Sequence, residues 1–219
     1  ESRIWSPVTV RFCSRSVPDG QPGGALLFTP IRFMTGVLLA CPHRPPCPGC
    51  PRFGEPGAEP RALGALAALC READLPPPTV VEGAPLGYRV RARLAVRGRA
   101  ASPKLGIFQE GSHRIVDIPN CVVHHPHVNA VAAAVKEAVR ATGVAPYADR
   151  PHRGDLRYVQ VVVERASGRA QIVLVGNAAD PESLAPVARR LEASLGDGLH
   201  SLWWNGNPAR TDVILGPHW

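Results

Sequence analysis

The stretch Leu86-Gly-Tyr-Arg-Val-Arg-Ala-Arg-Leu-Ala-Val-Arg-Gly-Arg99 alternates apolar and basic residues with a period of two. This alternation predicts a β-strand whose apolar face packs on a core. Its arginines share the other face, and like charges aligned on one strand face repel one another unless an anion covers them. We therefore expect three of them to contact a nucleic-acid backbone, with a solvated outer face as the alternative. The three are Arg89, Arg91 and Arg93.

Strands and helices alternate around this stretch in an order that predicts the fold class. Further strands are expected at 105–109, 113–118, 158–164, 169–176, 200–204 and 211–215. Helices are expected at 61–73, 127–142 and 180–195, the last with Asp180 as its N-cap. This order predicts an α+β fold, in which helices cover one face of an antiparallel-rich sheet.

Composition narrows the class of protein. The chain has 219 residues, of which 45% are hydrophobic and 20% charged, as is typical of a globular protein. Its formal net charge of +7 favours a polyanionic partner, although an arginine-rich genome would give the same excess. No apolar run reaches the roughly 18 residues of a membrane span, so we expect a cytoplasmic protein without a membrane partner.

Three cysteines cluster in Cys41-Pro-His-Arg-Pro-Pro-Cys47-Pro-Gly-Cys50, and each is followed by proline. The prolines disfavour a helix here and hold the thiols on a stiff loop, while Gly49 allows a tight turn. The C-x2-C half has the spacing with which two thiolates reach one metal centre. We interpret the loop as three ligands of a metal site, with the fourth supplied from elsewhere.

Cys121 is the candidate for that fourth ligand, because it follows a predicted strand in a loop between Pro119 and Pro126. A three-plus-one thiolate set favours an iron–sulfur cluster; zinc and the absence of any metal are the alternatives. Three histidines, His124, His125 and His127, are nearby, but beside four thiols they are interpreted as residues of a helix N-terminus.

The residues before the cysteine loop lack sustained periodicity, and the chain holds a single methionine, Met34. We expect 1–33 to be a tail or a mis-extended start, 34–60 a cysteine-rich loop, and 61–219 the central α+β domain. A different reading takes Val37-Leu-Leu-Ala-Cys41 as a lipoprotein cleavage site, which its broken upstream apolar region disfavours.

Several segments together resemble the iron–sulfur-containing bacterial RNA uridine-C5 methyltransferases of 23S rRNA. The segments occur in the same order: Cys41-Pro-His-x3-Cys47-x-Gly-Cys50, Gly87-Tyr-Arg-x-Arg-Ala-Arg-Leu, Leu105-Gly-Ile-Phe, Gly111-Ser-His-x-Ile-Val-Asp117-Ile and Cys121. The resemblance implies that Cys41, Cys47, Cys50 and Cys121 hold a [4Fe–4S] cluster. It also implies that the central domain contacts RNA, which is rRNA in this family, as a monomer.

The resemblance ends where those enzymes carry their S-adenosylmethionine-binding domain, for which no strand with a glycine-rich turn is evident. The nucleophilic cysteine and the carboxylate base of the family belong to that domain, so no catalytic or cofactor-binding residue is assigned. We expect a cluster-bearing, RNA-recognition portion of a uracil-C5 methyltransferase, as in a fragment incomplete for catalysis. The alternative is a stand-alone RNA-binding or zinc-stabilised module without enzymatic activity.

Overall fold

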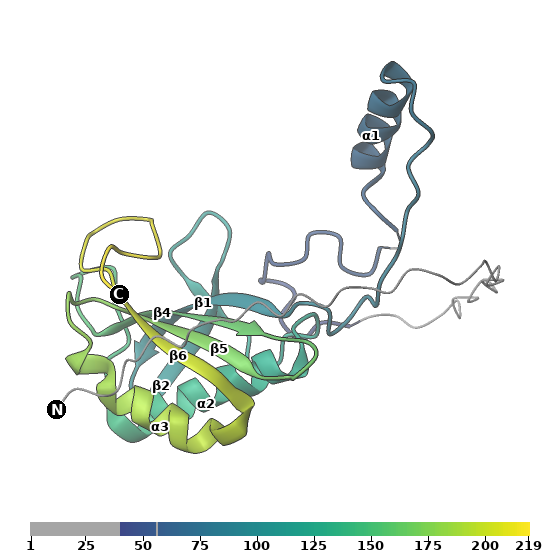
Figure 1. Cartoon of the computed structure of the whole chain (residues 1–219). Helices are drawn as coiled ribbons and strands as arrows, with labels where there is room; N and C mark the ends of the chain where they lie inside the picture. The colour runs from purple at the N-terminus through teal and green to yellow at the C-terminus, as the bar shows by residue number, and fades with distance from the viewer. Residues whose placement is uncertain (1–39, 56) are drawn as a thin grey trace. The chain divides into compact units, whose positions relative to one another are not determined.

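The computed structural model describes residues 40–55 and 57–219, so the predicted tail 1–33 lies outside its described part. Six strands in the described residues form one sheet in the order β3-β2-β1-β4-β5-β6 (Figure 1). Every neighbouring pair is antiparallel except β5 and β6, which are parallel. The strands are β1 (Arg91–Arg99), β2 (Ser102–Phe108), β3 (Ile115–Asp117), β4 (Leu156–Val163), β5 (Ala170–Gly176) and β6 (Leu199–Gly206).

Helices α2 (Pro126–Thr142) and α3 (Ala185–Leu195) lie side by side on one face of the sheet (Figure 1). The expected α+β class, with helices on one face of an antiparallel-rich sheet, is confirmed. Helix α2 ends where Gly143 adopts a left-handed conformation, with φ of 72°. Helix α1 (Pro60–Glu72) matches the expected helix at 61–73 and has no buried residue. None of the described helices is both long and apolar enough to cross a membrane.

The core lies between the sheet and these two helices. Valines recur along one side of α2 at helical spacing, and Val128, Val131 and Val135 are fully buried. The apolar face of β1 meets them through Leu94 and Val96, which are also buried. Burying each such side chain contributes about 1.5–3 kcal/mol, which fixes the register of β1 and hence the position of its arginines.

Helix α3 begins later than expected. A short 3-10 turn, η1 (Glu182–Leu184), precedes it, and a second one, η2 (Gly196–Gly198), follows it. Asp180 Oδ1 accepts a hydrogen bond from Glu182 N at 3.1 Å, but the N-cap residue of η1 is Pro181 and that of α3 is Leu184. The prediction of Asp180 as the N-cap of this helix is therefore wrong, because the first turn forms as a separate 3-10 helix.

The prediction of a strand at 211–215 is wrong. This segment has no neighbouring strand, and two buried asparagines of β6 and its end hold it instead. Asn207 Nδ2 donates to the carbonyls of Val213 and Ile214 at 2.7 and 3.1 Å. Asn205 Nδ2 donates in the same way to the carbonyl of Gly216 at 3.0 Å. Side chains thus satisfy backbone groups that would otherwise need a ladder partner.

Candidate cysteine site and nucleic-acid interface

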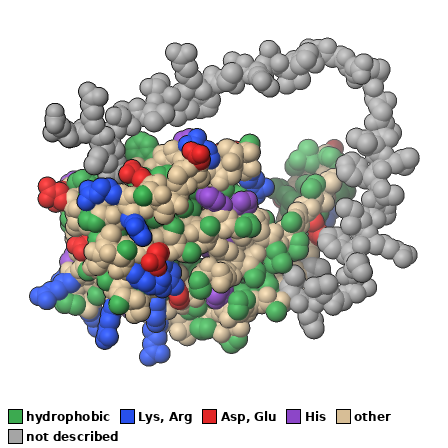
Figure 2. All heavy atoms as spheres, turned by 90° about the horizontal axis from the view of Figure 1, so that it is seen from below, with side chains coloured by type: hydrophobic (Ala, Val, Ile, Leu, Met, Phe, Trp, Pro, Cys, Tyr) green, Lys and Arg blue, Asp and Glu red, His purple; other side chains and the backbone are tan. Residues whose placement is uncertain are grey.

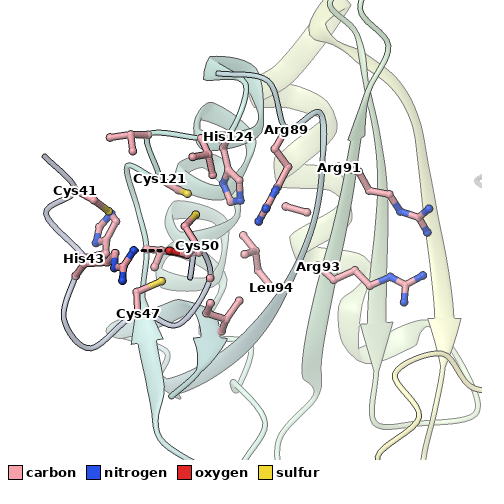
Figure 3. Close-up of a pocket in the computed structure, with 17 residues that line it drawn as sticks. Cys41, His43, Cys47, Cys50, Arg89, Arg91, Arg93, Leu94, Cys121 and His124 are labelled. Atoms are coloured by element: carbon pink, nitrogen blue, oxygen red, sulfur yellow. Dashed lines mark hydrogen bonds between the residues drawn. The ribbon is translucent and has the colours of Figure 1, made fainter. Parts of the chain in front are cut away.

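The structure brings the four predicted cysteine ligands to one pocket of about 240 Å³, which we call the cysteine pocket (Figure 3). Cys41, Cys47 and Cys50 come from the loop that precedes α1, and Cys121 comes from the loop between β3 and α2. The sulfurs of Cys50 and Cys121 point toward each other in Figure 3. Apolar side chains of the sheet, including Leu94 and Ile107, complete the lining.

The proline-rich loop is folded closely on itself and on the sheet. Cys47 N donates to His43 O at 2.9 Å, and Arg44 Nη1 donates to Cys50 O (Figure 3). A Cβ at Gly49 would lie 3.1 Å from Ile107 Cδ1 and 3.4 Å from Cys47 Sγ. Gly49 is not among the glycines with positive φ. Close packing against β2 therefore explains the glycine better than the tight turn that we expected there.

Cys121 is held by the start of α2. Its carbonyl accepts hydrogen bonds from His124 N at 3.1 Å and from Asn129 Nδ2 at 3.0 Å. The same loop pairs with the chain before β1, because Arg89 N donates to Val123 O at 2.8 Å. Cys121 is only 9% exposed as a result. The expected helix N-terminus is confirmed as well, since His125 caps α2.

The cysteines lie close enough to act on one another electrostatically. Burial raises the pKa of the Cys50 thiol; nearby Arg89 opposes this shift, and the other three cysteines add to it. Among the described residues, however, no three His, Cys, Asp or Glu side chains are grouped so as to hold one metal ion.

Two histidines of the pocket were not predicted as site residues. His43 lines it with a buried Nε2 that has no hydrogen-bond partner. His124 lines it from the other side, and its Nδ1 lies 3.2 Å from Asn129 Oδ1. Burial lowers the pKa of His124, although the Asn129 contact opposes that shift, so its neutral form is favoured. The Cys-Pro-His sequence at 41–43 was the available signal for the first of them.

The three predicted RNA-contacting arginines separate into two groups. Arg89 lies just before β1 and points toward Cys50 and His124, whereas Arg91 and Arg93 point away from the cysteines (Figure 3). Arg91 Nη2 and Arg93 Nε both donate to Gln160 Oε1, at 3.2 and 2.6 Å. Both side chains are exposed on the sheet face that α2 and α3 leave open.

Arg97, a further arginine of the strand face that was expected to need an external anion, is paired within the protein. It is 9% exposed, and its Nη2 forms an ion pair with Asp149 Oδ1 at 3.0 Å. Its guanidinium also lies over three aromatic rings at 4.9–5.5 Å: Phe108, Tyr147 and Tyr158. The acidic neighbour is 52 residues away in sequence, which is why local pattern did not reveal it.

Among similar proteins, one from Protochlamydia amoebophila, named an uncharacterized RNA methyltransferase, is 37% identical over 191 residues. The match covers 83% of this chain and 48% of that protein. A Gloeobacter violaceus protein with the same kind of name is 29% identical over 197 residues, or 83% of this chain and 43% of that one. These matches support the assignment of this chain to the RNA methyltransferase family. The chain spans about half the length, or less, of the curated relatives it matches. No family model matches it.

A solved structure shares the fold. The crystal structure of Pyrococcus abyssi tRNA (uracil-54, C5)-methyltransferase in complex with S-adenosyl-L-homocysteine superposes with a TM-score of 0.58 and 21% sequence identity. The match covers 81% of this chain and 41% of that one. At this identity the likeness establishes the α+β architecture.

Proposed function

We propose that this chain is the RNA-recognition part of an S-adenosylmethionine-dependent RNA uracil-C5 methyltransferase that modifies rRNA. In this proposal Cys41, Cys47, Cys50 and Cys121 hold a [4Fe–4S] cluster, and the protein works in the cytoplasm as a monomer. The observation that carries the proposal is the meeting of four cysteines from two separate segments in one pocket. The 37% identity with a protein named an RNA methyltransferase supports the enzyme class.

The pocket residues fit a cluster chemically. Four thiols and an apolar lining are the surroundings in which protein iron–sulfur clusters are held. A single zinc ion would need its sulfurs roughly 3.8 Å apart, since tetrahedral Zn–S bonds are about 2.3 Å long. The cysteine sulfurs around a cubane of eight atoms lie farther apart than the ligands of a single ion. The absence of a ligand group for one metal ion among the described residues is therefore no test of a cluster. When bound, the cluster would cross-link the proline-rich loop to the loop before α2.

Metal and sulfide content test the cluster. The chain purified without oxygen is expected to be brown and to contain about four iron and four sulfide per chain. Cys121→Ser should lose most of the iron, whereas Cys70→Ser, on α1 and outside the pocket, should keep it. Zinc without iron would contradict the cluster and favour a zinc-stabilised RNA-binding module.

The RNA part of the proposal depends on Arg91 and Arg93. Both lie on the open sheet face, and Gln160 orients them, so their guanidinium groups are available to phosphates. A double variant, Arg91→Gln with Arg93→Gln, should lower the slope of log affinity against log salt by about two. Replacing two exposed arginines of α3, Arg189 and Arg190, in the same way is the matched control. Equal slopes for the two double variants would contradict a role for the open face.

The methyl donor has no fitting site among the described residues. Strand β5 leads through α3 to the parallel β6, but the turn after β5, Gly176-Asn-Ala-Ala-Asp180, holds a single glycine. The strand–turn–helix site that binds such a cofactor in α/β sheets needs a glycine-rich turn at this position. We therefore assign no catalytic residue and derive no transfer step, and we expect this chain by itself to bind RNA without methylating it.

A further inference from the structure

The open face of the sheet carries a second hollow, of about 640 Å³, which we call the aromatic groove. The floor of the groove carries little side-chain bulk, because Ala95 of β1 is paired with Gly106 of the neighbouring strand β2. Phe108 and Tyr158 stand on either side of these two small residues, and Arg93 extends the same face. The segment 210–214 forms one wall. The volume is within the roughly 300–1,000 Å³ of small-ligand sites.

A neighbouring cation holds the aromatic walls of the groove. The guanidinium of Arg97, which is not among the lining residues, lies over the rings of Phe108 and Tyr158 at 5.5 and 5.4 Å from their centroids. Asp149 and the carbonyl of Arg157 bind its guanidinium at 3.0 Å each, so the charge is fixed in place. Rings supported in this way present their remaining surfaces to the groove without needing a ligand to order them. Flat, sequence-tolerant stacking of bases uses such surfaces.

A buried cation also lines the groove. The register of β4 and β5 shifts between Leu156 and Tyr158, and this bulge sends both Arg157 and Tyr158 toward the groove. Arg157 is 3% exposed, and the carbonyls of Asn207, Ala209 and Thr211 accept hydrogen bonds from its Nη atoms, so only its Nε lacks a partner. In the described part of the chain, no carboxylate lies within ion-pair distance of Arg93, Arg157 or Arg210. Backbone carbonyls satisfy Arg157, whereas Arg93 and Arg210 line the groove without a carboxylate partner, so the groove favours an anionic ligand such as a phosphate.

We propose that the aromatic groove binds one unstacked nucleotide of a single-stranded RNA. The base lies against Phe108 and Tyr158, and its phosphates face Arg93 and Arg210. Asp212, which also lines the groove, accepts a hydrogen bond from an amino group on the base edge. The inference rests on the proposed RNA-binding function and adds a defined subsite to it.

Affinity for a short single-stranded RNA of mixed sequence tests this subsite in the full chain. Phe108→Leu keeps apolar bulk but removes the ring, and it should weaken binding at least about fivefold. Phe108→Tyr restores the ring and should bind within about twofold of wild type. Arg210→Gln should lower the salt slope by about one, and Arg190→Gln on α3 should not. Circular dichroism melting shows whether each variant folds.

Photocrosslinking identifies the contact directly. The same RNA with 5-iodouridine in place of uridine should cross-link to peptides that contain Phe108 or Tyr158. If Phe108→Leu and Arg210→Gln bind like wild type, and cross-links fall elsewhere, the groove proposal is overturned. Binding that depends on Arg91 and Arg93 alone would then leave the proposed function standing. A wild-type chain that binds no RNA at any salt concentration would overturn both, and would leave a protein surface as the occupant of the groove.

Discussion

The cysteine pocket and the aromatic groove lie on neighbouring parts of one sheet, yet they are built in different ways. Next to the groove, an ion pair with Asp149 and hydrogen bonds to backbone carbonyls hold Arg97 in place. Its guanidinium in turn makes cation–π contacts with the surrounding rings. In the pocket, half-buried thiols stand on a loop, and burial, followed by the other cysteines, raises the pKa of Cys50. If both proposals hold, the groove is already formed before an RNA arrives, whereas the pocket depends on its cluster.

The two faces of the sheet also differ in charge. On the helix-bearing side of the molecule, basic and acidic side chains are interspersed, as Figure 2 shows. On the opposite face of the sheet, Arg91 and Arg93 share one amide oxygen and have no acidic partner within the described ranges. This difference supports the proposal that phosphates bind on the open face.

The largest expected effect is on the groove, through Arg97→Met. This change removes the buried charge that holds three rings and leaves Asp149 without its partner. The Asp149 side chain is 39% exposed, so most of the cost comes from the hydrogen bonds to carbonyls and the ring contacts that are lost with the guanidinium; together these cost about 3 kcal/mol of unfolding free energy, which urea denaturation measures. Arg99→Met, an exposed neighbour on the same strand, should change stability by less than about 0.5 kcal/mol. If the two variants are equally stable, the contacts of Arg97 with Asp149 and the three rings do not stabilise the groove.

The next effect concerns the wall of the groove. Asn207→Asp keeps the shape of a buried side chain but cannot donate to Val213 O and Ile214 O. Two carbonyls lose their donor, so we expect a loss of about 2 kcal/mol and easier proteolysis of 208–219. Iron content should not change, because the segment does not line the cysteine pocket. A variant as stable and as protease-resistant as wild type would contradict this account of the segment.

A smaller effect is expected in the cysteine pocket from Gly49→Ala. The new Cβ would press on Ile107 and on the Cys47 sulfur, and the overpacking should cost about 1 kcal/mol. Gly83→Ala is the matched control, because a Cβ there meets nothing within 4 Å. Thermal melting of both variants measures the difference. A chelator should remove iron faster from Gly49→Ala than from Gly83→Ala. Equal rates of iron release would show that the packing of the loop does not affect the cluster.

The smallest effect lies outside both regions, at the turn between β4 and β5. Hydrogen bonds from Ser167, and one from the backbone of Ala166, hold the pKa of Glu164 below its usual value. A carboxylate with a lowered folded pKa stabilises the protein above its unfolded pKa, near 4.5, and that contribution is lost as pH falls through the folded value. Melting temperatures of wild type and Glu164→Gln should differ at neutral pH and converge in acid. A difference that persists in acid would contradict the assignment.

Local periodicity predicted the elements that it controls directly. The alternation in β1 and the helical spacing in α2 follow from which side chains face the core, so sequence alone placed both, although β1 begins at Arg91 rather than at Leu86. The segment 211–215 looked like a strand, but the side chains of Asn205 and Asn207 satisfy its backbone, and no local pattern encodes that.

The candidate sites depend on contacts between distant residues. Residue types and spacing suggested Cys121 as the partner of Cys50, but only the fold brings the two segments to one pocket. The groove escaped sequence analysis because Phe108, Tyr147 and Tyr158 come from separate segments and meet over Arg97. Its buried Arg157 depends on a bulge in β4, which the strand pattern did not reveal.

The central claim is that one four-iron cluster joins the cysteine loop to Cys121. Mössbauer spectroscopy of the iron-labelled chain, purified without oxygen, tests this claim most directly. The account predicts the signature of a single [4Fe–4S] cluster in wild type and its loss in Cys121→Ser, with Cys70→Ser unchanged. Isolated iron ions, or a cluster that is unaffected by the loss of Cys121, would contradict it.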